Sequence, residues 1–254
     1  MNPAAGSTPP PPGGDDDDRH AVDVEDVLTL LAGGEIEVQG RLPYASNGTF
    51  LVRVEAGDMV AGAVYKPVAG ERPLWDFPPG LHKREVAAFR LAEALGMPVI
   101  PPTVLRDGPL GEGSVQLFID ADFSEHHFTL VEHGQHHDQL RQICLFDIVA
   151  NNTDRKSGHC LLGRDGRIWG IDHGLCFSRE FKLRTVIWDF SGEPIAEPWL
   201  HLLLGVARGA ASKSLAPLLS PAEVDAVAGR ARWLAECGEF PHDDAGHRWP
   251  WPLV

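Results

Sequence analysis

Two acidic motifs in the second half of the chain have the residue types and spacing of a phosphoryl-transfer site. The first is Asn152-Thr153-Asp154-Arg155, and the second is Ile171-Asp172-His173-Gly174. Phosphoryl transfer from ATP uses one carboxylate to orient the attacking hydroxyl and another to hold the metal ion that neutralises the phosphates. Asp154 and Asp172 are the candidates for these two roles, and a predicted hairpin separates them.

Two residues close to Asp154 bear on the metal and phosphate chemistry. His159 follows Asp154 by five positions, where a kinase normally carries a metal-binding asparagine. A neutral imidazole ligates divalent ions, and it suits Zn²⁺ or Mn²⁺ better than Mg²⁺. Single-metal catalysis, an altered metal preference and lost catalysis all stay open. Lys156 is a candidate catalytic residue that could neutralise the transferring phosphoryl group, or it could be a solvated loop charge.

Three further parts of such a site precede these motifs. The turn Ser46-Asn47-Gly48-Thr49 is rich in small residues, which let backbone N–H groups approach phosphate. Lys66 on a predicted strand supplies a positive charge for the α- and β-phosphates, and Glu85 on a predicted helix would pair with it. Alone, these parts could be a hairpin turn, a snorkelling lysine and a charge favoured in a helix's first turn. The order of all five parts favours the nucleotide-binding interpretation.

The elements around these residues predict an α+β fold with a small β-rich lobe and a larger helical lobe. Alternating apolar residues and turn residues predict strands over Ile36–Leu42, Phe50–Glu55, Val60–Lys66, near Val104, and over Ser114–Ile119, Cys160–Leu162 and Arg167–Ile171. Apolar residues at helical spacing predict helices over Asp23–Leu31, Leu81–Leu95, His137–Ala150, Trp199–Gly209 and Pro221–Cys237. We therefore expect a disordered Pro/Gly/Asp leader over 1–20, an N-lobe with the nucleotide-binding turn over 21–119, and a C-lobe with the catalytic motifs over 120–254.

Composition limits the partners and the compartment. The chain has 254 residues and a net charge of −14, which disfavours nucleic acid and anionic membrane surfaces. No signal peptide or membrane span is predicted, and four cysteines without a C-x-x-C pair suggest buried thiols in a reducing, cytoplasmic compartment. Five histidines lie within twelve residues, and without ligand spacing they favour an exposed loop over a metal site: His126, His127, His133, His136 and His137.

The motifs together resemble the phosphatidylinositol 3-/4-kinase superfamily. They are closest in style to type II phosphatidylinositol 4-kinases, with some likeness to HipA-type bacterial kinases, and suggest a divergent actinobacterial-type member. The resemblance covers residues 36 to 180 and is carried by Pro43-x-x-Ser46-x-Gly48-x-Phe50, Tyr65-Lys66-Pro67, Asn152-Thr153-Asp154-Arg155 and Ile171-Asp172-His173-Gly174-Leu175-x-Phe177.

The resemblance implies a bilobal protein-kinase-like fold that binds Mg-ATP between its lobes. Lys66 would contact the ATP phosphates, Asp154 would be the catalytic aspartate and Asp172 the metal-binding one, while His159 replaces the family's metal-binding asparagine. The hinge would span Gln116–Asp120, and its residues Gln116, Phe118 and Ile119 would receive adenine through backbone groups.

The sequence thus predicts an ATP-dependent phosphotransferase using Mg²⁺ or Mn²⁺. A protein or soluble small-molecule acceptor is favoured over an inositol lipid, because the chain is acidic and poor in lysine. Trp249-Pro250-Trp251-Pro252 near the C-terminus is expected to pack onto the C-lobe. Two alternatives remain: an ATP-binding pseudokinase with a regulatory role, and transfer of AMP on the same fold.

Overall fold

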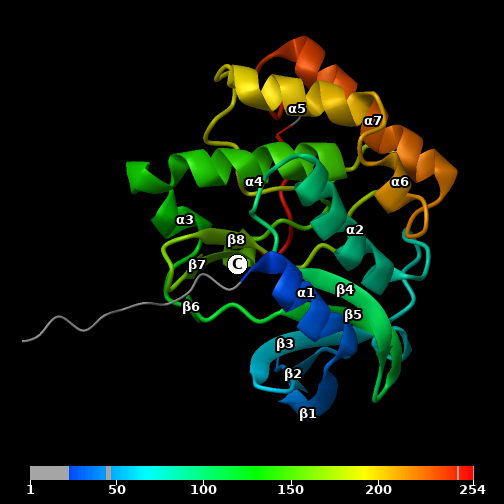
Figure 1. Ribbon diagram of the computed structural model, residues 1–254. Helices are drawn as coiled ribbons and strands as arrows, with labels where there is room; N and C mark the ends of the chain where they lie inside the picture. The colour runs from blue at the N-terminus through cyan, green and yellow to red at the C-terminus, as the bar shows by residue number, and fades with distance from the viewer. Residues whose placement is uncertain (1–22, 44–46, 245, 254) are drawn as a thin grey trace, which may run out of the picture.

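An antiparallel five-stranded sheet forms the N-lobe of the computed structural model, which describes residues 23–43, 47–244 and 246–253 (Figure 1). The strand order is β1-β2-β3-β5-β4. Helix α2 lies between this sheet and the helical layers, and it contacts β4, β5, α4 and α6. The N-lobe elements are α1 (Val24–Gly33), β1 (Glu35–Arg41), β2 (Phe50–Ala56), β3 (Met59–Pro67), α2 (Leu81–Ala94), β4 (Thr103–Gly108) and β5 (Gly111–Leu117).

The C-lobe combines a small three-stranded sheet with layers of helices. Its strands, in the order β6-β7-β8, lie next to α4, and α5 packs on α7 at the far side (Figure 1). The elements are β6 (Ala121–Asp122), α3 (His127–Leu130), α4 (His137–Ala150), β7 (Cys160–Gly163), β8 (Ile168–Gly170), α5 (Glu197–Ala207), α6 (Ser212–Leu215) and α7 (Pro221–Cys237), with 3-10 turns at Val68–Gly70, Gly134–His136 and Ser157–His159.

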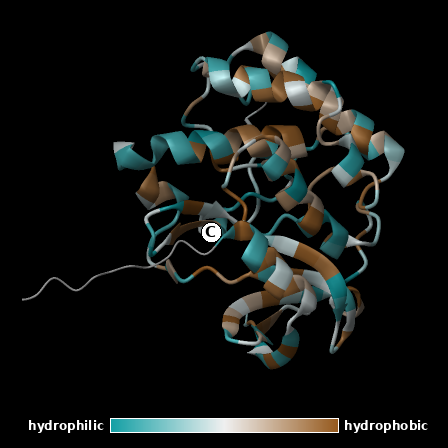
Figure 2. Ribbon diagram, viewed as in Figure 1, coloured by the Kyte–Doolittle hydropathy of each residue, from teal (hydrophilic) through white to brown (hydrophobic). Residues whose placement is uncertain are grey.

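Helix α4 forms the centre of the main core. Figure 2 shows it changing from hydrophilic at its start to hydrophobic along its second half. Leu145, Phe146 and Val149 are fully buried there. A helix that is apolar on every side is stable only when other elements surround it, which is why the pattern predicts a central helix. The predicted range of α4 is confirmed.

The predicted α+β plan of two lobes is confirmed, and most elements lie within two residues of their expected bounds. Helix α7 begins as its sequence indicates, with a capping box between Ser220 and Glu223 and proline at its first position. All four cysteines are free, and Cys144, Cys160 and Cys176 are buried. Burial raises the pKa of the Cys160 thiol to about 12.

The prediction that the histidine cluster forms an exposed loop is wrong. His127 is fully buried in the short helix α3, and His136 is buried just before α4. His127 Nε2 lies 2.9 Å from Asp189 Oδ2, which gives the imidazole a polar partner in the interior. Histidine carries an apolar body as well as polar nitrogens, so the missing ligand spacing argued against a metal site but did not imply exposure. The elements β6, α3 and α6 were also missed, because each is only two to four residues long.

The predicted leader, residues 1–20, lies wholly outside the described residues. Within the part of the chain that is described, no helix is both long enough and apolar enough to cross a bilayer.

Candidate active site

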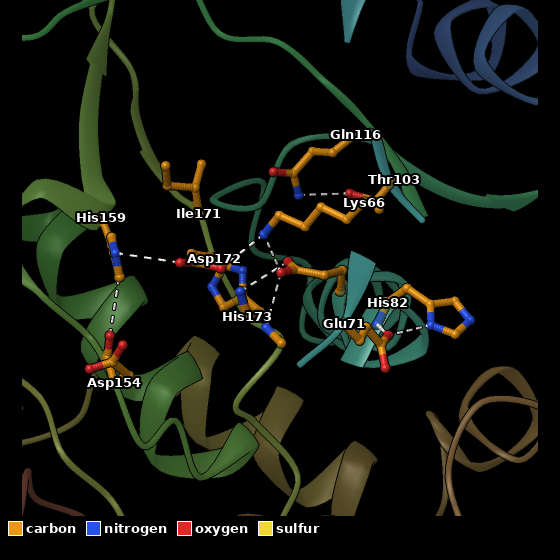
Figure 3. Close-up of polar contacts among 12 residues, drawn as sticks. Lys66, Glu71, His82, Thr103, Gln116, Asp154, His159, Ile171, Asp172 and His173 are labelled. Carbon is orange, nitrogen blue, oxygen red and sulfur yellow. Dashed lines mark hydrogen bonds and ion pairs between the residues drawn. The ribbon is translucent and has the colours of Figure 1, made fainter. Parts of the chain in front are cut away.

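Lys66 contacts one carboxylate of its own lobe, Glu85, and one of the C-lobe, Asp172 (Figure 3). Strand β3 carries Lys66, helix α2 carries Glu85, and Asp172 follows β8 in the C-lobe. Lys66 Nζ donates to Glu85 and lies 2.8 Å from Asp172 Oδ1. The sheet and α2 therefore deliver a cation and a carboxylate to the loop that carries Asp172.

Glu85 does more than pair with Lys66. Its carboxylate also accepts hydrogen bonds from the backbone N–H of His173 at 2.9 Å and of Gly174 at 3.0 Å. Asp172, the residue before them, has a φ of +59°, which is uncommon for a residue other than glycine. The buried Glu85 side chain thus holds the Asp172 loop in this conformation and ties its position to helix α2.

The members of this trio shift one another's pKa. Burial opposes the charge on Lys66, but the carboxylates of Asp172 and Glu85 outweigh it and raise the pKa of Lys66. The Lys66 ammonium holds the pKa of Asp172 well below its usual range. Burial raises the pKa of Glu85 against the opposing attraction of Lys66. Asp172 is consequently an anion at any ordinary pH, with about half of its side chain accessible to solvent.

Asp154 sits on a tight loop after α4. The helix ends at Asn151, whose left-handed conformation (φ +56°) turns the chain back, and Asn152 Oδ1 accepts from the Asp154 N–H at 3.0 Å. Asp154 Oδ2 lies 3.0 Å from Lys156 Nζ. Burial raises the pKa of Asp154, while the hydrogen bond and charge of Lys156 partly offset that rise. The pKa of Asp154 therefore depends on whether the Lys156 ammonium stays next to the carboxylate.

His159 lies between Asp154 and Asp172 (Figure 3). Its Nδ1 lies 3.1 Å from the Asp154 carbonyl oxygen, and its Nε2 lies 3.6 Å from Asp172 Oδ2. Burial lowers the pKa of His159 to about 4, so the imidazole is neutral near pH 7. Because Nδ1 faces a carbonyl acceptor, the proton belongs on Nδ1, and the Nε2 lone pair faces the Asp172 carboxylate.

A buried ion pair that the sequence did not reveal holds these loops together. Arg155 donates to Asp147 on α4 through Nε at 2.8 Å and Nη2 at 2.9 Å, and neither side chain is exposed. Arg155 Nη1 also donates to the carbonyl oxygens of His159 and Ile171, at 3.0 and 2.9 Å. One guanidinium therefore fixes α4, the Asp154 loop and the strand that leads to Asp172. Asp147 inside an otherwise apolar helix was the available clue.

The small-residue turn before β2 packs away from this trio. Gly48 N–H donates to the Gly70 carbonyl at 2.8 Å, and a Cβ on Gly48 would lie 2.9 Å from the Gly70 Cα. Asn47 Oδ1 accepts from the backbone N–H of Arg72 at 3.0 Å, and Thr49 is buried. Ser46 lies outside the described residues. The requirement for glycine here comes from the close approach of two backbone segments.

A cavity of about 380 Å³ borders this turn. Arg41, Gly48, Gly70 and Arg72 are among its lining residues, whereas Lys66, Asp154 and Asp172 are not. The charged trio therefore does not line the cavity beside the turn.

The expected hinge residues lie at the end of β5. The Gln116 side chain is buried and donates to Thr103 Oγ1 at 2.9 Å, so it braces β5 against β4 (Figure 3). The Phe118 N–H donates to the Gly62 carbonyl at 2.9 Å. Among the described residues, Ile119 has no backbone hydrogen-bond partner.

The Asp172 carboxylate and the His159 imidazole are the side chains in this site that could bind a metal ion. No group of three or more His, Cys, Asp or Glu side chains with metal-binding geometry occurs in the ranges 23–43, 47–244 and 246–253. Asp172 and His159 offer two ligands only. That donor set fits an ion whose remaining ligands are water molecules, which the phosphate oxygens of a nucleotide can replace.

Two solved structures share the fold of this chain. The Golgi casein kinase with Mn/ADP bound matches with a TM-score of 0.58 and 16% identity, covering 91% of this chain and 80% of that one. Hydra Fam20 with sugar matches with a TM-score of 0.52 and 15% identity, covering 86% of this chain and 88% of that one. At these identities the likeness establishes the fold, which is kinase-like as the sequence predicted.

Sequence comparisons give the family. Residues 106–202 match the phosphatidylinositol 3- and 4-kinase family. The chain is 38% identical over 265 residues to Rv2133c of Mycobacterium tuberculosis, covering 90% of this chain and 95% of that protein. It is 28% identical to phosphatidylinositol 4-kinase gamma 4 of rice, covering 65% of this chain but only 35% of the rice protein. The chain belongs to the same family as Rv2133c, and its residues 106–202 carry the match to the phosphatidylinositol 3- and 4-kinase family.

Proposed function

We propose that the protein is an ATP-dependent kinase that transfers the γ-phosphoryl group to an alcohol. The observation that carries this proposal is the bridge from Lys66 to both Glu85 and Asp172. It places a fixed cation, the glutamate that aims it and a solvent-accessible carboxylate at the junction of the two lobes. Those are the parts that position nucleotide phosphates in this fold.

Nucleotide would bind along the junction of the lobes, whose boundary we place between residues 119 and 120. The Ile119 N–H would receive adenine, and Lys66 would contact the α- and β-phosphates. Asp172 and His159 would hold Mg²⁺ or Mn²⁺. When bound, the metal supplies positive charge against the β- and γ-phosphate oxygens. The turn residues Asn47, Gly48 and Thr49 would then cover the phosphates only after a change in their packing against Gly70.

Asp154 would orient the acceptor hydroxyl. As the oxygen–phosphorus bond to the acceptor forms and the bond to ADP breaks, the hydroxyl proton passes to the Asp154 carboxylate. The raised pKa of Asp154 favours its role as a proton acceptor near neutral pH. Lys156 would leave Asp154 for the transferring phosphoryl group and balance its charge.

The acceptor we favour is a hydroxyl on a protein or a soluble small molecule. The chain's net charge of −14 works against docking on an anionic membrane surface. The phosphatidylinositol 4-kinase names of the plant relatives describe proteins of which this chain spans about a third or less.

The proposal is tested by incubating the full chain with ATP labelled at the γ- or α-phosphate, with Mg²⁺ or Mn²⁺. Autophosphorylation, ATP hydrolysis and transfer to added proteins are the readouts. We expect γ-label transfer or hydrolysis in the wild type, and its loss in Asp154→Ala and Asp172→Ala. Asp165→Ala, at an exposed turn, is the matched control and should keep activity. Nucleotide binding without turnover would instead indicate a pseudokinase, and α-label transfer would indicate AMP transfer.

A further inference from the structure

The imidazole of His159 and the carboxylate of Asp172 present two electron-pair donors to each other. Nδ1 of His159 lies 3.1 Å from the Asp154 carbonyl oxygen and 3.5 Å from the backbone nitrogen of Lys156. The longer contact exceeds an ordinary N–H···N hydrogen bond, so the carbonyl decides the tautomer and Nδ1 carries the proton. Nε2 is then an unprotonated donor directed at Asp172 Oδ2.

The 3.6 Å separation of these two atoms is too long for a charged hydrogen bond. It is close to the spacing of two ligands on one metal ion. Donors about 2.1 Å from a metal lie about 3.4 Å apart at the tetrahedral angle. Octahedral Mg²⁺, with ligands at about 2.05 Å and right angles, needs adjacent donors about 2.9 Å apart. The gap is therefore closer to the spacing of two tetrahedral ligands than to that of two adjacent ligands of octahedral Mg²⁺.

The position of His159 is fixed from three directions, which favours a site that exists before nucleotide arrives. Arg155 Nη1 donates to the His159 carbonyl at 3.0 Å, and the His159 N–H donates to the Lys156 carbonyl at 3.1 Å. The imidazole proton on Nδ1 donates to the Asp154 carbonyl, an outer contact of the kind that orients metal-bound histidines. Because these contacts already hold the imidazole in place, metal binding would cost little conformational entropy at His159.

We propose that His159 Nε2 and Asp172 Oδ2 form a preformed nitrogen/oxygen site that binds a divalent first-row transition ion in preference to Mg²⁺, without nucleotide. Imidazole nitrogen suits such ions, whereas Mg²⁺ demands oxygen ligands and keeps its waters. The ion shares Asp172 with Lys66, which stays on Oδ1. This inference rests on the proposed function, because it assigns the metal of the same site.

The experiment uses Mn²⁺ as the probe on the full chain without ATP. Electron paramagnetic resonance titration gives the affinity, and electron spin-echo modulation reports nitrogen bound to the ion. We expect nitrogen modulation in the wild type and Mn²⁺ binding that a 100-fold excess of Mg²⁺ does not abolish. His159→Asn should lose the modulation and weaken Mn²⁺ binding roughly tenfold or more, since even outer contacts of metal ligands are worth 10–100-fold.

His201→Asn is the matched control, because His201 also lies near a carboxylate, 3.7 Å from Glu197, but on an exposed helix surface. It should change neither readout. Asp172→Asn, a second variant at the site, should weaken Mn²⁺ as His159→Asn does. Absence of nitrogen modulation in the wild type, or equal Mn²⁺ affinity in wild type and His159→Asn, overturns the inference. Neither result depends on γ-label transfer, so the metal site and the proposed kinase activity can fail separately.

Discussion

The buried pair of Asp147 and Arg155 allows a quantitative test of what holds the candidate active site together. Asp147→Ala removes a carboxylate that receives two charge-assisted hydrogen bonds from Arg155, at 2.8 and 2.9 Å, and one from Asn152 Nδ2 at 2.9 Å. Both members of the pair have no exposed side-chain surface. After the substitution the guanidinium keeps its carbonyl acceptors but has no counter-charge.

The expected loss of unfolding free energy follows from this buried, unpaired charge on Arg155. Breaking one partner of a buried pair costs about 3–5 kcal/mol of unfolding free energy, because the remaining charge stays desolvated. The whole chain's stability is expected to be about 5–15 kcal/mol. For a protein of this size, each kcal/mol lowers the melting temperature by about 2–4 °C, so we expect a fall of about 6–20 °C.

Thermal and urea unfolding followed by circular dichroism give the measurement. The matched control is Asp165→Ala, which breaks an ion pair with Arg167 at 2.7 Å whose side chains are about half exposed. Exposed pairs contribute about 0–1 kcal/mol. The double variant Asp147→Ala/Arg155→Met should lose less than the two single variants added together, because it leaves no unpaired charge. If Asp147→Ala costs no more than Asp165→Ala, the reasoning that this pair organises the site is refuted.

Three further predictions concern the proposed chemistry, all measured as steady-state kinase kinetics with ATP. Asp154→Asn should lower kcat by about 10²–10⁴-fold at unchanged melting temperature, since it removes a general base while keeping the shape of the side chain; an unchanged kcat contradicts that role. Lys156→Ala should move the acidic limb of the kcat/KM profile to higher pH, because Lys156 lowers the pKa of Asp154 and its loss raises it; a shift to lower pH contradicts the sign. Glu85→Gln keeps one acceptor oxygen for the backbone N–H groups of His173 and Gly174, replaces the second oxygen with an amide NH2, and removes the charge that aims Lys66. We therefore expect KM for ATP to rise while the fold persists; an unchanged KM would mean that Glu85 does not contribute to nucleotide binding.

Local patterns in the sequence were enough to predict the longer helices and most of the strands. The apolar second half of α4, the capping residues of α7 and the Asp-Gly turn between β7 and β8 each depend on residues within one or two turns of chain. The short elements β6, α3 and α6 escaped prediction, because their stability comes from contacts outside the segment. Histidine burial at His127 escaped for the same reason, since its partner Asp189 is 62 residues away.

The sequence by itself determined which chemical groups were available: the order of Lys66, Glu85, Asp154 and Asp172, and histidine at position 159. Only the tertiary structure decided how those groups meet. Glu85 contacts the backbone after Asp172 across 88 residues, and the Asp147–Arg155 pair reaches the carbonyl oxygens of both loops. The tertiary structure also packs Gly48 of the small-residue turn against Gly70, and it sets the 3.6 Å distance between His159 Nε2 and Asp172 Oδ2. Distances of this kind arise from packing between lobes and loops, which a motif's spacing along the chain does not encode.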